Sequence, residues 1–262
     1  MLLLLTNDDG ISAPGLEALV RALDPVAECW VVAPAQEQSA GSHSLSLHRP
    51  LRVRPAGARR FSVDGSPADC VYVGLGSLCP RRPDAVISGI NHGANLSLDV
   101  YYSGTVAAAR EATMWGVPAL AVSLLVDVPG AAVERHWTGA AGMARQVVET
   151  MRVCGLPAET LLNLSVPNLP PQEIRGLHLA RLGRRIWSRV VDERRDLKGR
   201  PYCWIGGSHL GFSGGPGTDG ALAPAGWATL TPLQLDCTAE RAFADLARWP
   251  ILHGPLSPDE ER

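Results

Sequence analysis

Short apolar runs bounded by turn residues recur along the first two thirds of the chain. Each run is shorter than a typical helix and stops within two residues of Asn, Asp, Gly or Pro, which predicts buried strands over residues 1–6, 29–33, 84–88, 119–125 and 161–166. The segment between the first two runs has the 3.6-residue period of an amphipathic helix, with an apolar face made by Leu16, Leu19, Val20 and Leu23. Strand–helix–strand units of this kind form parallel sheets with right-handed crossovers, so the pattern predicts an α/β protein.

Capping and turn residues indicate where other elements begin and end. Ser12 is expected to cap the first helix, with Pro14 in its first turn, where a missing N–H costs nothing. The same reasoning predicts further helices over residues 69–78, 103–115 and 134–153. A short hairpin is expected from residues 51–53 and 61–63.

The character of the sequence changes after about residue 182. Seven basic residues lie between positions 184 and 200, and two strand-like runs, 186–191 and 202–205, flank a polar turn. We interpret this region as an extended hairpin that leaves the core, with its charges in solvent. The remaining elements expected are a glycine-rich loop over 211–220, a late strand over 227–235 and a last helix from Thr238 to about Ala247.

Composition excludes several classes of protein. The chain has 262 residues, 46% of them hydrophobic, and its 24 Lys and Arg against 26 Asp and Glu give a net charge of -2. This balance disfavours binding to a DNA duplex or to an acidic membrane, and no apolar run approaches the length of a membrane span. The Leu2–Leu5 run is too short for the core of a signal peptide. The six cysteines form no CxxC pair and are expected to be mostly buried, reduced thiols of a cytoplasmic protein.

Oxygen-bearing side chains follow three of the predicted strands. Asp8 and Asp9 come directly after the first strand, Ser39 lies in the loop after the second, and Asn91 follows the third. Because the carboxyl ends of parallel strands meet at one edge of a sheet, we expect these four side chains to converge. Two carboxylates, a hydroxyl and an amide oxygen suit one hard divalent cation, Mg²⁺ or Mn²⁺, and leave room for a bound phosphate.

A second group of residues predicts an anion site. Ser103, Gly104 and Thr105 open a helix directly, and Asn95 lies in the loop before it. A helix N-terminus presents free N–H groups and partial positive charge to a phosphate, and Gly104 allows the backbone to approach a ligand closely. A metal beside an anion site indicates phosphate-ester chemistry, in which the metal polarises the phosphoryl oxygen and activates a water.

Four titratable residues are candidates for proton transfer in such a reaction. One of Asp8 and Asp9 is expected to orient or deprotonate the attacking water. His43 and His92 flank the same loops, and either could protonate the leaving oxygen or contact the substrate. A Gly-x-Gly-x-x-Gly pattern does not follow the first strand, which disfavours a dinucleotide-binding domain.

Six segments in consecutive order resemble the SurE family, the survival protein SurE family of metal-dependent nucleotidases. They are TNDDGISAPGLEAL (6–19), VVAPAQEQSAGSHSLSL (31–47), VDGSPADCVYVGL (63–75), PDAVISGINHGANLSLDVYYSGTVAAAREATMWGVPALAVSL (83–124), NLSVPNLP (163–170) and GPGTDGALAPAGWATLTPLQLD (215–236). The resemblance covers most of residues 1–125 and two later blocks. It implies metal ligands at Asp8, Asp9, Ser39 and Asn91, and phosphate-binding residues at Asn95, Ser103, Gly104 and Thr105.

The resemblance also implies an architecture. We expect a Rossmann-like, three-layer α/β/α core over residues 1–182 with a mostly parallel sheet, and a β-hairpin extension with a Gly-rich loop over 183–220. Residues 221–262 are expected to supply a late strand that returns to the core and a C-terminal oligomerisation helix. The resemblance further implies a homodimer or homotetramer built partly by exchanged C-terminal elements.

The leading hypothesis is a divalent-metal-dependent phosphomonoesterase that hydrolyses nucleoside 5′- and 3′-monophosphates, a 5′-nucleotidase or acid-phosphatase-like phosphoric monoester hydrolase. His43 is expected among the substrate contacts. One alternative is a phosphatase that forms an aspartyl-phosphate on Asp8. Others are a non-catalytic nucleotide-binding regulator that uses the same crevice, and an assembly protein whose working part is the 184–220 hairpin.

Overall fold

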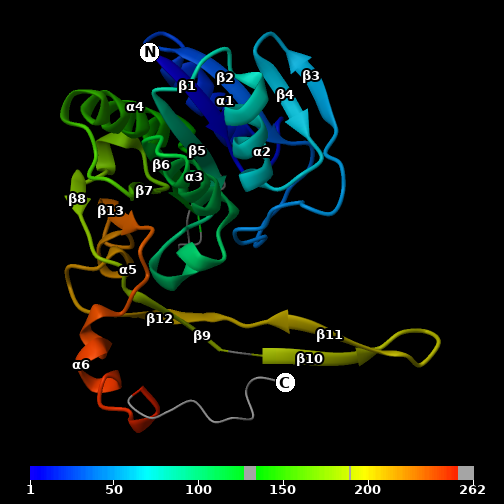
Figure 1. Cartoon of the computed structure of the whole chain (residues 1–262), viewed down its shortest axis with the longest axis vertical. Helices are drawn as coiled ribbons and strands as arrows, with labels where there is room; N and C mark the ends of the chain where they lie inside the picture. The colour runs from blue at the N-terminus through cyan, green and yellow to red at the C-terminus, as the bar shows by residue number, and fades with distance from the viewer. Residues whose placement is uncertain (127–133, 189, 253–262) are drawn as a thin grey trace.

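A nine-stranded, mostly parallel sheet forms the centre of the protein (Figure 1). The computed structural model describes residues 1–126, 134–188 and 190–252. Five strands in the spatial order β2-β1-β5-β6-β7 run parallel to one another: β1 (Leu2–Thr6), β2 (Glu28–Pro34), β5 (Ala85–His92), β6 (Ala119–Leu125) and β7 (Thr160–Pro167). The predicted α/β class is confirmed.

Further strands extend the sheet at both edges. The hairpin β3 (Val53–Gly57) and β4 (Arg60–Val63) adds to β2 through a parallel β4–β2 pair. At the other edge β13 (Ala228–Gln234) runs antiparallel to β7, and β8 (Leu177–Leu179) pairs with β13. The predicted early hairpin and late strand are therefore present, although the first hairpin strand begins at Val53 rather than at Leu51.

Helices cover the two faces of the sheet and enclose two apolar cores. α1 (Pro14–Leu23) and α4 (Trp137–Cys154) pack together on one face, while α2 (Pro67–Val73) and α3 (Gly104–Met114) pack together on the other. Residues 2–5 of β1 are fully buried because they face helices on both sides. Burial on both faces explains why this strand is a continuous leucine run rather than an alternating one.

Several predicted helix ends are wrong by a few residues, for local reasons. Ala13 is the N-cap of α1 and makes no side-chain capping bond, whereas Ser12 lies outside the helix. The helix predicted over 69–78 begins at Pro67, behind a capping box in which Ser66 and Asp69 bind each other's backbone N–H groups, and its last part is a π turn, η1 (Gly74–Leu78). α4 begins at Trp137 rather than at residue 134.

The basic region forms an extended hairpin that leaves the sheet, with two separate ladders (Figure 1). β9 (Arg184–Trp187) pairs with β12 (His209–Ser213), and further out β10 (Val190–Arg195) pairs with β11 (Pro201–Gly206). The expected loop over 211–220 is only partly a loop, because it begins inside β12 and ends in α5 (Asp219–Leu222). Three-residue and five-residue 3₁₀ turns complete the body, η3 (Pro171–Glu173) and η2 (Ser97–Tyr101).

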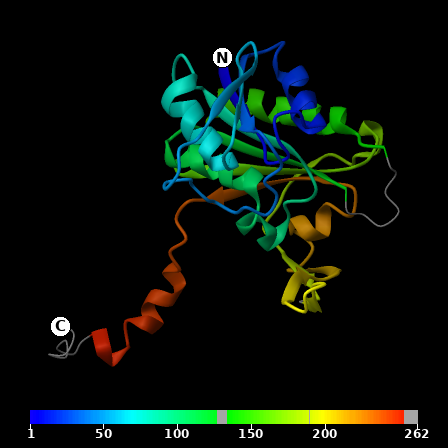
Figure 2. The ribbon, with the colours of Figure 1, turned by 90° about the vertical axis from the view of Figure 1, so that its right-hand side faces the viewer.

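The C-terminal segment from Asp236 to Leu252 stands away from the body of the molecule (Figure 2). It contains η4 (Glu240–Ala242), α6 (Phe243–Leu246) and η5 (Pro250–Leu252). The continuous helix predicted from Thr238 is wrong, since helical turns begin only at Glu240 and the Thr238 N–H donates to Asp236 Oδ1 at 2.7 Å. Within the part of the chain that the structure describes, no helix is both long and apolar enough to cross a bilayer.

The expectation that the cysteine side chains are mostly buried is also corrected. Cys29 and Cys70 are buried and Cys79 is intermediate, but Cys154, Cys203 and Cys237 are exposed. Two of the exposed thiols lie on the hairpin and in the C-terminal segment, where the chain has left the apolar cores.

Replacement of Gly15 is expected to test the packing of α1 against the sheet. A Cβ on Gly15 would overlap the backbone carbonyl oxygen of Ile90, which cannot move independently of β5. Gly15→Ala should therefore lower the free energy of unfolding by about 1–3 kcal/mol, measured by urea denaturation at fixed protein concentration. Gly142→Ala in α4 is the matched control, because a Cβ there meets nothing within 4 Å. Equal stability of the two variants would contradict this account of the α1–β5 contact.

Candidate metal- and phosphate-binding site

A polar edge lies where the strand order of the sheet reverses. β1 has β2 on one side and β5 on the other, so the connections that leave these strands diverge at the carboxyl end of β1. Ligands of open α/β sheets bind outside the carboxyl ends of strands at such a switch point. Asp8 and Asp9 directly follow β1, and Asn91 lies near the end of β5.

Asp8 joins the end of β1 to the start of α3. Its carboxylate is buried, its Oδ2 accepts the backbone N–H of Thr105 at 3.1 Å, and its Oδ1 accepts the Thr105 hydroxyl at 2.6 Å. A Cβ on Gly104 would lie 3.0 Å from Asp8 Cβ, so glycine allows the helix to approach this closely. Asn7 fixes the same turn, because its Nδ2 donates to Gly10 O and its Oδ1 accepts the Gly10 N–H.

The end of β5 lies against Asp9. Asp9 Oδ2 accepts the backbone N–H of His92 at 3.0 Å, which brings the neighbouring residue Asn91 to the same edge. The register of β5 against β6 shifts between Ser88 and Asn91, so the strand is irregular where it reaches the site. The Asn91 Nδ2 donates to Gly93 O at 2.9 Å, which orients its amide group.

The loop after β2 is also attached to this edge. The Gln38 N–H donates to the backbone carbonyl of Asp8 at 2.8 Å, so Ser39 follows directly on a residue that contacts the Asp8 turn. The Ser39 side chain is exposed, and its hydroxyl donates to Glu37 Oε1 at 2.6 Å. The three chain segments that carry the four predicted metal ligands are thus connected by hydrogen bonds, and the ligand roles themselves stay predictions.

The electrostatics of the two carboxylates fit a divalent cation. Burial, and to a smaller extent the charge of Asp9, raise the pKa of Asp8 to about 6, against the lowering effect of the Thr105 hydroxyl. Burial also raises the pKa of Asp9, although the His92 N–H counteracts this. Among the described residues, no Lys or Arg forms an ion pair with either carboxylate, and the charge interaction with His92 favours Asp9 alone.

The chemistry of the donor set is that of a hard-cation site. Among the described residues, no group of three or more His, Cys, Asp or Glu side chains could hold a metal ion. The predicted set has only two such residues and takes its other oxygens from Ser39 and Asn91, as Mg²⁺ and Mn²⁺ sites with bound waters often do.

Three of the predicted phosphate residues form the start of α3, and Asn95 lies in the loop before it. Ser103 is the N-cap as expected, and its Oγ accepts the Val106 N–H at 3.0 Å. Asn95 is 5% exposed, its carbonyl accepts Asn163 Nδ2 at 2.8 Å, and its own Nδ2 has no hydrogen-bond partner among the described residues. A buried amide donor without a partner beside a helix N-terminus suits an anionic ligand. Thr105 instead uses its N–H and hydroxyl on Asp8.

The two histidines differ in their surroundings. His43 is largely buried, with an 18% exposed side chain, and its Nε2 lies 2.8 Å from Glu111 Oε2. His92 is exposed, its Nε2 accepts the Nε–H of Arg135 at 3.0 Å, and its ring lies 6.0 Å from that of Trp137.

Asp219 is a residue that the sequence reasoning missed. It is fully buried, and its carboxylate accepts the N–H of Ser97 at 2.6 Å, the Ser97 hydroxyl at 3.1 Å and the N–H groups of Gly183 and Gly220 at 2.9 and 2.7 Å. It therefore ties the base of the hairpin to the loop that carries Asn95 and Ser103. The Gly-Thr-Asp-Gly sequence at the start of a helix was the available signal.

A second link joins the same loop to the hairpin. Asp99 in η2 accepts from Arg185 Nη1 at 2.8 Å, and the Arg185 side chain is only 6% exposed. The Arg185 guanidinium also lies 4.4 Å from the centre of the Trp187 ring. One of the hairpin arginines thus has a structural contact with the site loop, whereas the region was expected to hold its charges in solvent.

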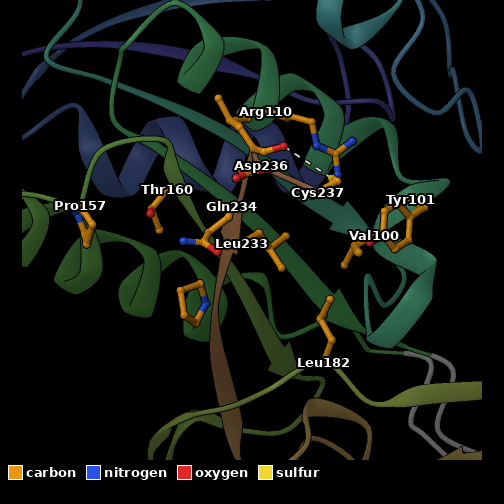
Figure 3. A pocket seen from close by; sticks show the side chains of 12 residues that line it. Val100, Tyr101, Arg110, Pro157, Thr160, Leu182, Leu233, Gln234, Asp236 and Cys237 are labelled. Atoms are coloured by element: carbon orange, nitrogen blue, oxygen red, sulfur yellow. Dashed lines mark hydrogen bonds between the residues drawn. The ribbon is translucent and has the colours of Figure 1, made fainter. Parts of the chain in front are cut away.

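A cavity of about 740 Å³ lies elsewhere, beside α3 and the end of β13 (Figure 3). Its lining includes Arg110 of α3, Thr160 at the start of β7, and Gln234, Asp236 and Cys237 at the root of the C-terminal segment. None of the predicted site residues lines this cavity. It is therefore distinct from the carboxyl-end edge that holds Asp8.

Comparisons with known proteins agree with this fold. A family model described as "Survival protein SurE" matches residues 3–189. The "5'-nucleotidase SurE" of Citrifermentans bemidjiense is 45% identical over 251 residues, which is 96% of this chain and 100% of that protein. The protein of the same name from Methylococcus capsulatus is 45% identical over 95% of this chain and 97% of its own length. A crystal structure of the SurE protein from Aquifex aeolicus superposes with a TM-score of 0.84 at 35% identity, and covers 97% of this chain and 100% of that chain.

The fold and the switch-point edge define an α/β protein with two adjacent carboxylates at the strand ends, one of them bonded to a helix N-terminus. The matches in sequence and structure extend over nearly the whole chain. The chain belongs to the SurE family, as its sequence motifs indicated.

Substitution of Asp219 is expected to show how much the link between loop and hairpin stabilises the protein. In Asp219→Asn one carboxylate oxygen becomes an NH₂ group, which cannot accept from the N–H groups of Ser97 or Gly183. The loss of a buried hydrogen bond should lower the free energy of unfolding by about 1–3 kcal/mol in urea denaturation. Asp245→Asn, at an exposed position, is the control and should leave the stability unchanged. Wild-type stability of Asp219→Asn would show that the link is not stabilising.

Proposed function

We propose that this protein is a divalent-metal-dependent phosphomonoesterase that releases phosphate from nucleoside 5′-monophosphates, and from 3′-monophosphates as well. The observation that carries the proposal is the pair of adjacent carboxylates, Asp8 and Asp9, at the switch point, joined by hydrogen bonds to the start of α3 and the end of β5. The relatives named 5′-nucleotidase, 45% identical over nearly the whole chain, support the same activity.

Four residues are proposed to hold one Mg²⁺ or Mn²⁺ ion: Asp8, Asp9, Ser39 and Asn91. When bound, such an ion supplies Lewis-acid polarisation of a phosphoryl oxygen and lowers the pKa of a coordinated water. The fit is supported by one buried and one partly buried carboxylate, neither of which forms an ion pair with a Lys or Arg among the described residues. Thr105 keeps the Asp8 carboxylate in one orientation, since both of its oxygens accept from that residue.

The substrate phosphate is proposed to bind at the start of α3. Asn95 would donate its Nδ2, which has no partner among the described residues, and Ser103 and Gly104 would present the helix N-terminus to the phosphate oxygens. Thr105, which was expected to bind phosphate directly, would instead hold Asp8 beside it. His43 would contact the substrate from the loop after β2. One of Asp8 and Asp9 would orient the attacking water and accept its proton. These residues would place water, phosphorus and leaving oxygen in line, which is the main requirement for phosphoryl transfer.

A direct attack by water is favoured over an aspartyl-phosphate on Asp8. Both oxygens of that carboxylate accept hydrogen bonds from Thr105. A carboxylate fixed in this way suits a metal ligand better than a nucleophile that must reach phosphorus. The stereochemistry at phosphorus, measured with a substrate whose phosphate is chiral by oxygen isotopes, distinguishes the two routes. Inversion supports direct attack, while retention, or a phospho-Asp8 trapped by rapid acid quench, would support the covalent route.

The activity is tested by phosphate release from nucleoside monophosphates with and without Mg²⁺ or Mn²⁺. Asp8→Asn and Asp9→Asn should each lower kcat by roughly two to four powers of ten, because each removes a charged oxygen ligand and a candidate base. Asp24→Asn, at the exposed end of α1, is the control and should retain the parent rate. Full activity after exhaustive chelation would overturn the metal requirement, and nucleotide binding without turnover would indicate a regulator instead.

We also propose that the protein functions as a homodimer or homotetramer. Large apolar side chains are exposed in the C-terminal segment, namely Phe243, Leu246, Trp249, Ile251 and Leu252. The outer hairpin exposes a further set, namely Val190, Val191, Leu197, Tyr202, Trp204 and Ile205. Apolar surface of this extent on extensions that leave the body supports burial against another copy of the chain, including exchange of the C-terminal segment.

The assembly is tested by sedimentation velocity of the purified protein. Trp249→Glu places a charge on the C-terminal segment and should shift the sedimentation coefficient to a smaller species. Val153→Glu introduces the same charge at an exposed apolar position on α4 and should leave the assembly intact. A parent protein that sediments as a monomer would overturn the oligomer proposal and leave the proposed activity untouched.

A further inference from the structure

The loop after β2 is fastened along α3 at two points. The Ser42 hydroxyl donates to Tyr101 O at 2.7 Å, and the Ser42 N–H donates to Tyr102 O at 3.1 Å, just before the Ser103 cap. The next residue, His43, reaches Glu111, which lies seven residues along the helix from Gly104. Seven residues are two helical turns, about 10.5 Å, so Glu111 and Gly104 are on the same face, and Glu111 leans back toward the helix start.

Glu111 is a buried carboxylate with two fixed partners. It is 4% exposed, its Oε2 lies 2.8 Å from His43 Nε2, and its Oε1 accepts the indole N–H of Trp115 at 2.9 Å. Among the described residues, His43 is its sole ion-pair partner. Burial of a carboxylate is costly unless its oxygens are hydrogen-bonded, so this arrangement holds the imidazole in one orientation.

The contact with Glu111 decides which ring nitrogen is available. An ionised carboxylate can only accept, so His43 Nε2 donates to Glu111 and Nδ1 faces away from it. A carboxylate that orients a histidine in this way leaves the second nitrogen to exchange a proton with the substrate. The loop that carries His43 begins beside Asp8, where Gln38 donates to Asp8 O, and passes the residues before Ser103.

His92 lacks such an arrangement. It is exposed, and its Nε2 is already engaged by the Arg135 guanidinium at 3.0 Å. A histidine acts as a general acid when both ring nitrogens carry protons. His92 Nε2 has no proton while it accepts from the guanidinium, whereas His43 Nε2 donates to a carboxylate and leaves Nδ1 able to carry a second proton. Of the two histidines near the site, His43 therefore has the contacts expected of a proton donor.

We propose that Glu111 is a positioning residue that holds His43 as the general acid for the leaving group. This inference rests on the proposed phosphatase function. In this step His43 is doubly protonated, with Nε2–H on Glu111 and a second proton on Nδ1. As the ester P–O bond breaks, its electron pair stays on the ribose oxygen, which takes the Nδ1 proton. The attacking water forms the new P–O bond and gives its proton to one of Asp8 and Asp9, which releases it to solvent, and His43 regains a proton from solvent. One water is consumed, and nucleoside and phosphate are released.

The experiment compares two substrates that differ in their need for a proton. The ribose alkoxide of a nucleoside 5′-monophosphate must be protonated as it leaves, whereas p-nitrophenolate leaves as a stable anion. Glu111→Gln keeps the size and one acceptor of the side chain and should lower kcat for the nucleotide by about 10-fold to 100-fold. The kcat for p-nitrophenyl phosphate should stay near that of the parent. His43→Asn should show the same selectivity, and the double variant should lose no more than His43→Asn alone.

Ser46→Ala is the matched control for loosening of the loop. It removes the bond of 2.8 Å between Ser46 Oγ and Asp69 Oδ2 in the same loop without contact to His43. It should leave the ratio of the two kcat values unchanged. An equal loss on both substrates in Glu111→Gln, additive losses in the double variant, or a changed ratio in Ser46→Ala would overturn the inference. A parent enzyme inactive on both substrates with Mg²⁺ and Mn²⁺ would instead overturn the proposed function.

Discussion

The bond between Asp8 and the start of α3 is the contact on which the rest of the site depends. Thr105 gives both its N–H and its hydroxyl to one buried carboxylate, and hydrogen bonds to a charged group are worth about 1.5–3 kcal/mol each. The carboxylate also lies at the positive end of the helix dipole. The end of β1 and the first turn of α3 are thereby held together, and Gly104 removes the side chain that would keep them apart. The proposed metal and phosphate sites share this junction.

The parallel core could be predicted from the sequence because its physics is local. A strand covered by helices on both faces must be apolar throughout, so residues 119–125 and the leucines of β1 were recognisable as strands. The carboxyl-end rule for such sheets then brought Asp8 and Asn91 to one edge, and the hydrogen bonds of Asp8 and Asp9 agree with that placement. The family motifs pointed to the same residues.

The contacts that could not be predicted join residues far apart in the chain. Nothing near Glu111 in the sequence indicates that it contacts His43, 68 residues earlier. Nor does it indicate that the face of α3 shared by Glu111 and Gly104 leads toward the site. Thr105 was expected to serve a phosphate, and its commitment to Asp8 depends on the distance between a strand end and a helix. The hairpin was expected as one pair of strands, and it divides into the β9–β12 and β10–β11 ladders. Local pattern carries no information on such distances.

The late position of Asp219 in the sequence has a consequence for folding during synthesis. It lies 122 residues after Ser97, whose N–H and hydroxyl it accepts, and it also binds Gly183 at the base of the hairpin. A chain emerging from the ribosome completes the parallel core, from β1 to β7, long before this carboxylate is added. The loop with Asn95 and Ser103 therefore forms its bonds to Asp219 only after the chain has been synthesised to that residue. Every residue proposed to touch the phosphate is translated in the first half of the polypeptide, yet the shape of their loop is completed only near its end.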